Sequence, residues 1–363
     1  MIILYLSIVL ILAAVVYMQQ HMFGKKPAGE RLARIIKSPN FRNGEFQNLS
    51  LTPDLSEGVT YYAVLKEFIF NKNKRRKPSD SLPTKKTNLL TISPEKDILV
   101  WFGHSSYFMQ IDRKKILVDP VLSGAASPIK FTTKSFSGTD VYTAGDIPDI
   151  DYLFISHDHW DHLDYETIKQ LKPRIKTVIC GLGTGQHFEH WGFHSSQVIE
   201  KDWGDELILD NGFVVNIESA RHFSGRGFKR NAALWISVVL TTPSMKIYIG
   251  GDSGYDTHFK AIGQKYGPFD LAILECGQYD KKWKYIHMMP EEIIKAANDL
   301  KARQLMPVHW GKFSLANHAW DDPIIQVSAF SKIKNQPIVT PMIGETVNLK
   351  DLSGFKSWWE KIK

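Results

Sequence analysis

The stretch SHDHWDHLD, residues 156–164, places three histidines and three aspartates in nine positions directly after an apolar segment, DYLFIS. The apolar segment predicts a buried strand. Burying polar side chains that lack partners costs several kcal/mol. The cluster is therefore either solvated or occupied by a bound ligand, and the chain needs a fold in which a core strand opens onto a polar site.

Three further predicted strands end in a residue that can ligate a metal. His222 follows VVNIESAR, Asp252 follows KIYIGG, and His309 follows QLMPV. One histidine after a strand is more often a hydrogen-bonded structural residue than a ligand. Four strand ends that all supply His or Asp favour one shared site, because ligands of open α/β folds collect at the carboxyl ends of strands.

Short strand-like and helical segments alternate from residue 96 onward, which predicts an α/β sandwich with two sheets inside and helices outside. The helical patterns fit best at about 164–172, 256–265, 290–302 and 323–334. The expected strands are 97–103, 107–111, 115–120, 151–156, 176–181, 214–219, 234–241, 246–251, 271–276 and 304–309.

The N-terminal segment MIILYLSIVLILAAVVYM carries no charged side chain. As a helix it would be about 27 Å long, close to the hydrocarbon thickness of a bilayer. We expect an uncleaved transmembrane anchor over 1–20, with a cleaved signal peptide and a buried core helix as alternatives. Lys and Arg follow the segment and none precedes it. This predicts a single-pass membrane protein with a cytoplasmic catalytic domain.

Residues 21–95 are rich in Lys, Arg, Ser, Pro and Asn and predict a basic lead-in with a short helix near 59–71, so the catalytic domain is expected over 96–363. Its densest basic run, KNKRRKPSDSLPTKK, suits an anionic lipid surface or is a solvated linker. The net charge of +7 is too diffuse to indicate a nucleic acid partner. Cys180 and Cys276 lie in apolar segments and are expected to be buried thiols.

The order H-x-H-x-D-H, followed by a single His, a single Asp and a final His, resembles the ligand order of the metallo-β-lactamase fold over about residues 96–350. More narrowly, several stretches are similar to N-acylphosphatidylethanolamine phospholipase D and its bacterial relatives. They are WFGHSSYFMQIDRKKILVDPVLSGAASP, ISHDHWDHLD, GGDSGYD, HMMPEEII and MPVHWGKF. The resemblance implies a four-layer αβ/βα sandwich.

The resemblance also implies two Zn²⁺ ions per subunit, held by the residues at the four strand ends. The ligands would be His157, His159 and His222 for the first metal, Asp161, His162 and His309 for the second, and Asp252 between both. Neutral imidazoles suit Zn²⁺, and a shared carboxylate offsets the repulsion between two dications. The same donors accommodate iron or manganese.

The implied activity is a phospholipase D-type hydrolysis of N-acylphosphatidylethanolamine to phosphatidate and N-acylethanolamine. Two metals would lower the pKa of a bridging water and stabilise charge on the phosphate, with Asp161 and Asp252 as catalytic ligands. His287 would donate a proton to the leaving alkoxide, and His104 would support the site from beneath. Basic residues after His222 would hold the lipid phosphate. These are Arg226, Lys229 and Arg230.

Rival functions of the same fold are a lactonase of the ascorbate-6-phosphate type or another small-substrate metallo-hydrolase, a nuclease and a non-catalytic scaffold. No inserted RNA-binding arm is visible between Asp252 and His309, and all seven candidate ligands are present. We therefore expect a membrane phospholipid as substrate, the bilayer as a partner through the N-terminal helix, and no nucleic acid. The resemblance also allows a homodimer.

Overall fold

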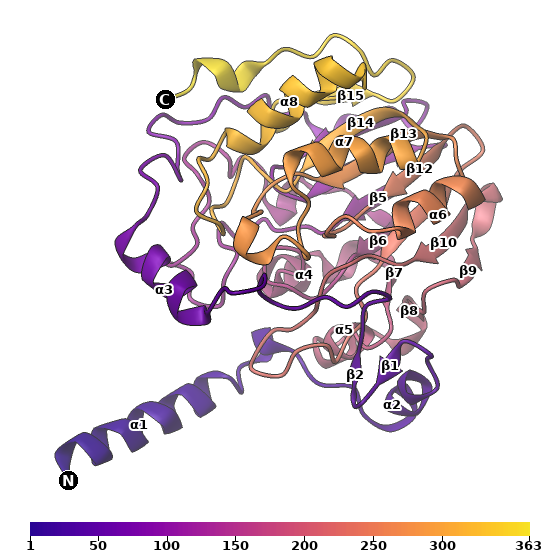
Figure 1. Ribbon diagram of the computed structural model, residues 1–363. Coiled ribbons are helices and arrows are strands. Elements are labelled where there is room, and N and C mark those ends of the chain that lie inside the picture. The colour runs from indigo at the N-terminus through magenta and orange to yellow at the C-terminus, as the bar shows by residue number, and fades with distance from the viewer.

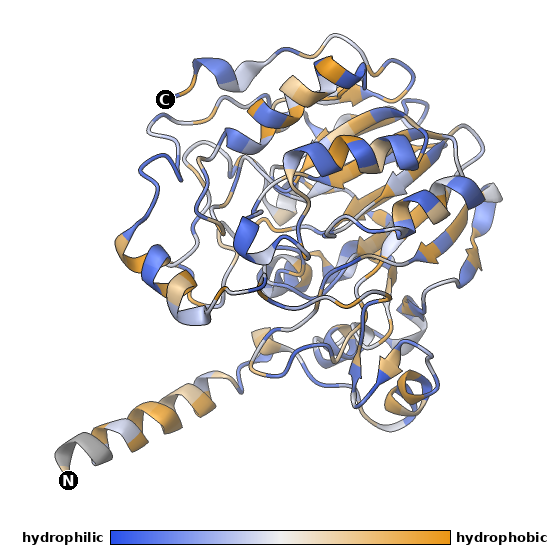
Figure 2. Cartoon of the chain, in the orientation of Figure 1, coloured by the Kyte–Doolittle hydropathy of each residue, from blue (hydrophilic) through white to orange (hydrophobic). Residues whose placement is uncertain are grey.

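The computed structural model describes the backbone of residues 1–363 and the side chains of all of them except residues 2–4. Two sheets pack face to face and helices cover their outer faces (Figure 1). This is the α/β sandwich that the alternating segments predict. The strands are mainly hydrophobic, whereas the helices that cover the sheets mix hydrophobic and hydrophilic residues (Figure 2).

The larger sheet has seven strands, in the order β15-β3-β4-β5-β6-β7-β8. Strands β5 to β8 are parallel. Of these, β5, β6 and β7 are buried over most of their length, which explains their apolar runs. The strands are β3 Ile98–Trp101, β4 Tyr107–Ile111, β5 Lys114–Val118, β6 Ile150–Ile155, β7 Ile175–Gly181, β8 Val198–Lys201 and β15 Thr346–Asn348.

The smaller sheet has six strands, in the order β14-β13-β12-β11-β10-β9. Its β12, β13 and β14 are parallel, and its remaining pairs are antiparallel. The strands are β9 Glu206–Ile208, β10 Val214–Glu218, β11 Ser237–Thr241, β12 Lys246–Ile249, β13 Phe269–Glu275 and β14 Ala302–Val308. A two-stranded hairpin of β1 Phe41–Arg42 and β2 Glu45–Phe46 stands apart.

Alternating side chains of each strand enter two different apolar layers. Met109 and Phe154 of the larger sheet face the smaller sheet, while Phe108 and Leu153 face helices α4 and α5. Helices α6, α7 and α8 cover the smaller sheet. The helices are α1 Ile2–Tyr17, α2 Gly29–Ile36, α3 Tyr61–Phe70, α4 Tyr165–Leu171, α5 Gly185–His190, α6 His258–Lys265, α7 Pro290–Asp299 and α8 Asp322–Lys334.

The expected transmembrane anchor over 1–20, and with it the single-pass membrane location, is wrong. No helix in the described part of the chain is long and apolar enough to cross a membrane. Helix α1 has 16 residues and ends at Tyr17, so it is about 24 Å long, against about 30 Å of hydrocarbon. Two contacts then turn the chain toward the sandwich: Tyr17 Oη donates to the carbonyl of Pro128 at 2.8 Å, and the ring of Phe23 packs edge-on against Trp160.

The basic lead-in runs along the sandwich and contains more regular structure than its composition predicts. Helix α3 occupies the expected position, but α2 and the hairpin were not anticipated. Arg31 of α2 pairs with Glu189 at 2.7 Å and with the buried Glu200 at 2.6 Å, which fixes α2 against α5 and β8. The domain limits 1–20, 21–95 and 96–363 stay a prediction.

Candidate metal centre

The loop after β6 carries the histidine and aspartate cluster of residues 156–164, and hydrogen bonds fix its conformation. Asp164 caps α4 by accepting from the main-chain nitrogen of Glu166. The Arg226 guanidinium donates to the main-chain carbonyls of Asp158 at 2.9 Å and Leu163 at 2.6 Å. These bonds close the loop into a fixed turn that projects its histidines toward the end of the smaller sheet.

Asp252, which follows β12, lies at the centre of the site. Its Oδ2 is 3.2 Å from His162 Nε2 and 3.2 Å from His309 Nε2. The same oxygen is 3.7 Å from His222 Nε2 and 3.9 Å from His157 Nε2. One carboxylate oxygen therefore faces imidazoles from three other strand ends, and Asp252 is only 3% exposed.

Three histidines form one half of the centre. His159 Nδ1 lies 2.9 Å from His157 Nε2 and 3.2 Å from His222 Nε2. The far nitrogen of His222 is 2.9 Å from the main-chain carbonyl of Ile286, which fixes that ring's orientation. Three nitrogens thus point toward one another inside a buried site, an arrangement that neutral imidazoles adopt around a cation.

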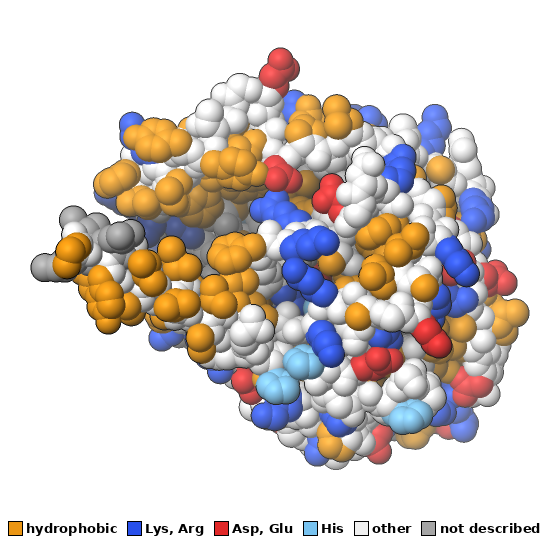
Figure 3. All heavy atoms as spheres, turned by 90° about the horizontal axis from the view of Figure 1, so that it is seen from below, with side chains coloured by type: hydrophobic (Ala, Val, Ile, Leu, Met, Phe, Trp, Pro, Cys, Tyr) orange, Lys and Arg blue, Asp and Glu red, His pale blue; other side chains and the backbone are white. Residues whose placement is uncertain are grey.

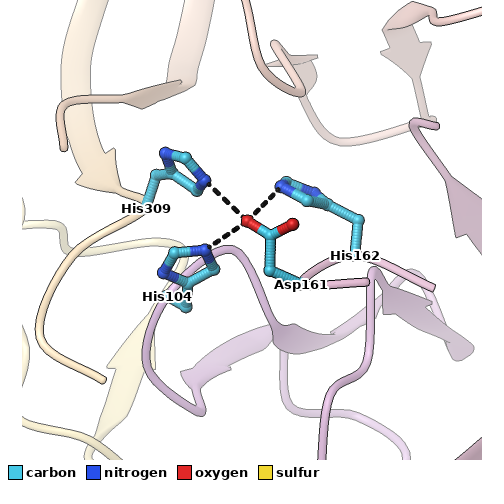
Figure 4. Close-up of side chains that lie close together, drawn as sticks. All are labelled: His104, Asp161, His162 and His309. Atoms are coloured by element: carbon cyan, nitrogen blue, oxygen red, sulfur yellow. Dashed lines mark hydrogen bonds and ion pairs between the residues drawn. The ribbon is translucent and has the colours of Figure 1, made fainter. Parts of the chain in front are cut away.

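The other half is built around Asp161 (Figure 4). Its Oδ2 lies 2.9 Å from His104 Nε2, 3.1 Å from His309 Nε2 and 3.5 Å from His162 Nε2. His104 comes from the turn between β3 and β4, and main-chain bonds tie it to the β14 end, where its carbonyl accepts from His309 N and its own N–H donates to Trp310. His104 therefore lies beside Asp161, His162 and His309, and is fully buried.

The electrostatics of the centre reflect burial and close opposite charges. Burial alone would raise the pKa of the Asp252 carboxyl, but His162 and His309 outweigh it and hold that pKa well below its usual range. Burial disfavours the charged form of His162, yet the Asp252 and Asp161 carboxylates hold its pKa well above its ordinary value. Burial keeps the pKa values of His157 and His222 well below the ordinary value for histidine, so these imidazoles are neutral.

The residues present fit a pair of divalent cations. Two buried atoms that face the centre, His162 Nε2 and Asp252 Oδ1, have no hydrogen-bond partner among the described residues. The donor set is imidazole nitrogen and carboxylate oxygen, which suits Zn²⁺, Fe²⁺ and Mn²⁺. His162, His222 and His309 each direct their second nitrogen to an oxygen that would orient them as ligands.

Sequence reasoning missed two acidic residues of this centre. Asp119, at the end of β5, lies 2.8 Å from His162 Nδ1 and accepts from Ser156 N. Its position after a predicted strand is the same signal that identified Asp252. Glu275 is the last residue of β13 and is completely buried, 3.7 Å from His287 Nδ1 and 3.9 Å from His309 Nδ1. Burial, reinforced by Asp252, raises its pKa well above the ordinary value.

His287 lies within the centre, as a neighbour of the strand-end residues. It forms a possible ligand group with His222 and Asp252, and its ring stacks on that of His309 with the centroids 5.2 Å apart. Burial lowers the pKa of His287 to about 3, so the imidazole is neutral at physiological pH. A neutral imidazole in such a place is able to donate one N–H to a substrate atom.

The three basic residues predicted to hold phosphate lie in different surroundings. Arg226 is buried, lies 3.9 Å above the Trp160 ring and also donates to the Met22 carbonyl, so its guanidinium is engaged by the protein. Lys229 is exposed. Arg230 is exposed, pairs with Asp54 at 2.9 Å and covers the Phe223 ring, which in turn packs against His159.

Comparisons with known proteins extend over most of the chain. Residues 114–310 match the family model of the β-lactamase superfamily domain. An uncharacterised protein of Mycobacterium tuberculosis is 33% identical over 327 residues, 89% of this chain and 88% of the relative. N-acyl-phosphatidylethanolamine-hydrolyzing phospholipase D 1 of Caenorhabditis elegans is 31% identical over 274 residues, 69% of this chain and 75% of the relative. The solved metallo hydrolase Igni18 of Ignicoccus hospitalis shares the fold, with a TM-score of 0.55 and 20% identity over 69% of this chain and 97% of that one.

Proposed function

Because this chain belongs to the β-lactamase superfamily and is a metal-dependent hydrolase, we propose that it is a phosphodiesterase of the phospholipase D type. Its substrates are N-acylphosphatidylethanolamine-type phospholipids, and its products are phosphatidate and an N-acylethanolamine. The observation that carries the proposal is the placement of Asp252, whose Oδ2 lies 3.2–3.9 Å from four imidazole nitrogens. A carboxylate in that position would join the two half-sites into one centre that holds two metals.

Two Zn²⁺ ions are the proposed metals, and seven residues would hold them. They are His157, His159 and His222 in one half, Asp161, His162 and His309 in the other, and Asp252 between the halves. When bound, two such metals supply an activated water at neutral pH and positive charge for the phosphate oxygens. Their ligands are oriented beforehand by oxygen atoms that are not themselves proposed ligands, because Asp119 and the Ile286 carbonyl each lie within 2.9 Å of a ligand's far nitrogen.

The remaining residues of the centre direct the substrate and its leaving group. His287, neutral because of burial, donates an N–H hydrogen bond to the oxygen that leaves phosphorus. Glu275, whose pKa is raised by burial, has its Oε1 3.7 Å from His287 Nδ1 and helps to position that ring. Arg230, at the edge of the site over Phe223, supplies a positive charge for the lipid phosphate. His104 Nε2 lies 2.9 Å from Asp161 Oδ2 and fixes the position of that carboxylate.

The choice of lipid substrate rests on two supports. The relative from Caenorhabditis elegans, named for hydrolysis of N-acylphosphatidylethanolamine, is 31% identical over 69% of this chain. Phe228, in the loop that follows His222, also has an exposed apolar side chain. Large exposed apolar groups near a site favour a substrate with an apolar part.

The test is phosphatidate release from N-acylphosphatidylethanolamine in mixed micelles, by metal-loaded wild type and by Asp252→Ala. Metal content is measured on both proteins by elemental analysis. We expect release by the wild type, and a loss of about 100-fold or more in the variant together with lowered metal content, because an essential shared ligand is gone. A wild type that holds two metals per chain and releases no phosphatidate would overturn the phospholipase assignment, and hydrolysis of a sugar-phosphate lactone instead would identify a small-substrate hydrolase.

A further inference from the structure

Helix α3 lies outside the sandwich and presents an apolar face to solvent. Tyr62 is 74% exposed, Leu65 58%, Ile69 53% and Phe70 76%. Positions 62, 65 and 69 follow the i, i+3, i+7 spacing of one helix face. An exposed apolar patch of this kind marks a binding surface, since scattered single side chains would not share a face.

The opposite face of α3 is firmly attached, so the exposure is not the result of a loose helix. Phe68 stacks on Trp283 with the ring centroids 6.1 Å apart. Glu67 pairs with Lys282 at 2.6 Å and accepts from Asn317 Nδ2 at 2.8 Å. Helix α3 is therefore fixed to η7 (Lys281–Trp283) and to the loop after β14, with its apolar row turned outward.

Both ends of α3 are connected to loops that carry residues of the metal centre. Trp283 lies four positions before His287 in the chain. At the N-terminal end, Tyr61 Oη donates to Asp54, and Asp54 pairs with Arg230. Arg230 covers the Phe223 ring next to His222. Helix α3 thus bridges the His222 loop and the His287 loop at the edge of the centre.

A basic groove adjoins the apolar face. The run Lys72–Lys77 begins two residues after α3, and all of its residues except Arg75 line, with Phe68, a groove of about 530 Å³. Its Lys72, Lys74 and Lys77 are exposed, whereas Arg76 donates to Ser314 Oγ and to the Ala316 carbonyl. Apolar side chains next to flexible lysines are the combination that binds an anionic membrane surface, since the first enter the headgroup layer and the second contact phosphates.

Other exposed apolar groups lie on the same side of the molecule. Seen from below, hydrophobic side chains border a hollow, with α1 along its lower side and Lys and Arg side chains at its inner end (Figure 3). The end of α1 contacts Pro128, and the exposed Ile129 and Phe131 follow directly. The α3 face is therefore part of a wider apolar margin.

We propose that the outer face of α3 and the exposed lysines of the run Lys72–Lys77 form a docking surface for an anionic phospholipid bilayer, which holds the metal centre at the lipid surface. The proposed function explains why the protein would dock on a bilayer, and the docking proposal rests on it only in that respect, because binding to a bilayer needs no catalysis. Charge and polarity select this occupant: a protein partner for the apolar row alone would not require the neighbouring lysines.

The experiment is co-sedimentation of the full chain with vesicles, either phosphatidylcholine alone or phosphatidylcholine mixed with phosphatidylglycerol. The variants are Leu65→Asp with Phe70→Asp, and Lys72→Glu with Lys74→Glu. The matched controls are Ile333→Asp and Lys334→Glu, which change an exposed apolar and an exposed basic residue of α8. We expect the wild type to bind the mixed vesicles, each α3-side pair to bind about tenfold or more weakly, and the controls to bind as the wild type does.

The results separate docking from catalysis. Hydrolysis of a short-chain monomeric diester reports the centre alone, and the α3-side variants should retain the wild-type rate. Asp252→Ala should bind vesicles normally, and vesicle binding without phosphatidate release would leave docking standing while the proposed function fails. Equal binding by wild type and α3-side variants, no binding by the wild type, or a dimer that Leu65→Asp dissociates would each overturn the docking proposal.

Discussion

One buried histidine outside the metal centre has no carboxylate in direct contact among the residues whose side chains are described. His258, at the start of α6, lies 3.2 Å from Ser253 Oγ and packs against Phe259. Burial lowers the pKa of His258 to about 4 from an ordinary value of 6.5, although Asp256 acts in the opposite direction. The folded protein therefore keeps this imidazole neutral at a pH where the unfolded chain binds a proton.

This difference predicts a specific acid destabilisation. A depressed histidine pKa leaves full stability above about pH 6.5, and stability falls as the pH decreases toward 4, because the unfolded state takes up the proton first. Over that pH range the uptake of a proton by His258 in the unfolded state lowers the free energy of unfolding by about 3 kcal/mol. Urea unfolding of metal-free His258→Gln and wild type should show a shallower pH dependence in the variant. Parallel pH profiles of the two proteins would contradict the assignment.

At the scale of elements, α6 and α7 approach each other closely at Gly263. A Cβ built at this position would overlap the main-chain carbonyl oxygen of Asp299, at the end of α7. Main-chain atoms of a packed helix cannot move aside as a flexible side chain does. The spacing of these two helices over the smaller sheet therefore depends on the absence of a side chain.

We predict that Gly263→Ala destabilises the protein by about 1–3 kcal/mol, the usual range for overpacking. Helix propensity alone would predict the opposite, a gain of about 1 kcal/mol from replacing a helical glycine. Gly145→Ala is the matched control, because a Cβ there meets only Thr143 Oγ1 at an ordinary 3.5 Å. Thermal unfolding of both variants measures the effect, and a stabilised Gly263→Ala would show that α6 and α7 can separate at no cost.

At the scale of the whole molecule, the metal centre joins both sheets. Its residues come from the ends of β6, β10, β12 and β14, and from the β3–β4 turn. Bound metals would crosslink the four strand ends that supply their ligands and stabilise the folded state by mass action. Chelation with EDTA should therefore lower the melting temperature of the wild type by several °C, about 2–4 °C for each kcal/mol lost.

The same chelation should have a much smaller effect on Asp252→Ala, since this variant holds less metal before treatment. Differential scanning calorimetry with and without EDTA measures both proteins, and adding Zn²⁺ back should restore the wild-type transition. An identical wild-type transition with and without EDTA, with elemental analysis showing that the metal had left, would mean that the centre contributes nothing to stability.

The local pattern of the chain predicts most of its elements. Apolar runs such as DYLFIS and KIYIGG indicate β6 and β12, because burial on both faces demands continuous apolar side chains. The short strands β8, β9 and β15 were not expected, since their burial is partial and their sequences lack a clear period. The positions of Asp161, His222 and His309 after strands are likewise visible in the sequence alone.

By itself, the sequence determined the α/β class and the polar strand ends, because both follow from the spacing of residues close together in the chain. Only the tertiary structure decided which of these ends meet: the pairing of sheets brings Asp252 to four imidazoles, and Glu275 and Asp119 join from strands read only as core. It also decided that α1 ends at Tyr17 and that Arg226 faces carbonyls. These outcomes depend on contacts between distant segments, which local propensity does not encode.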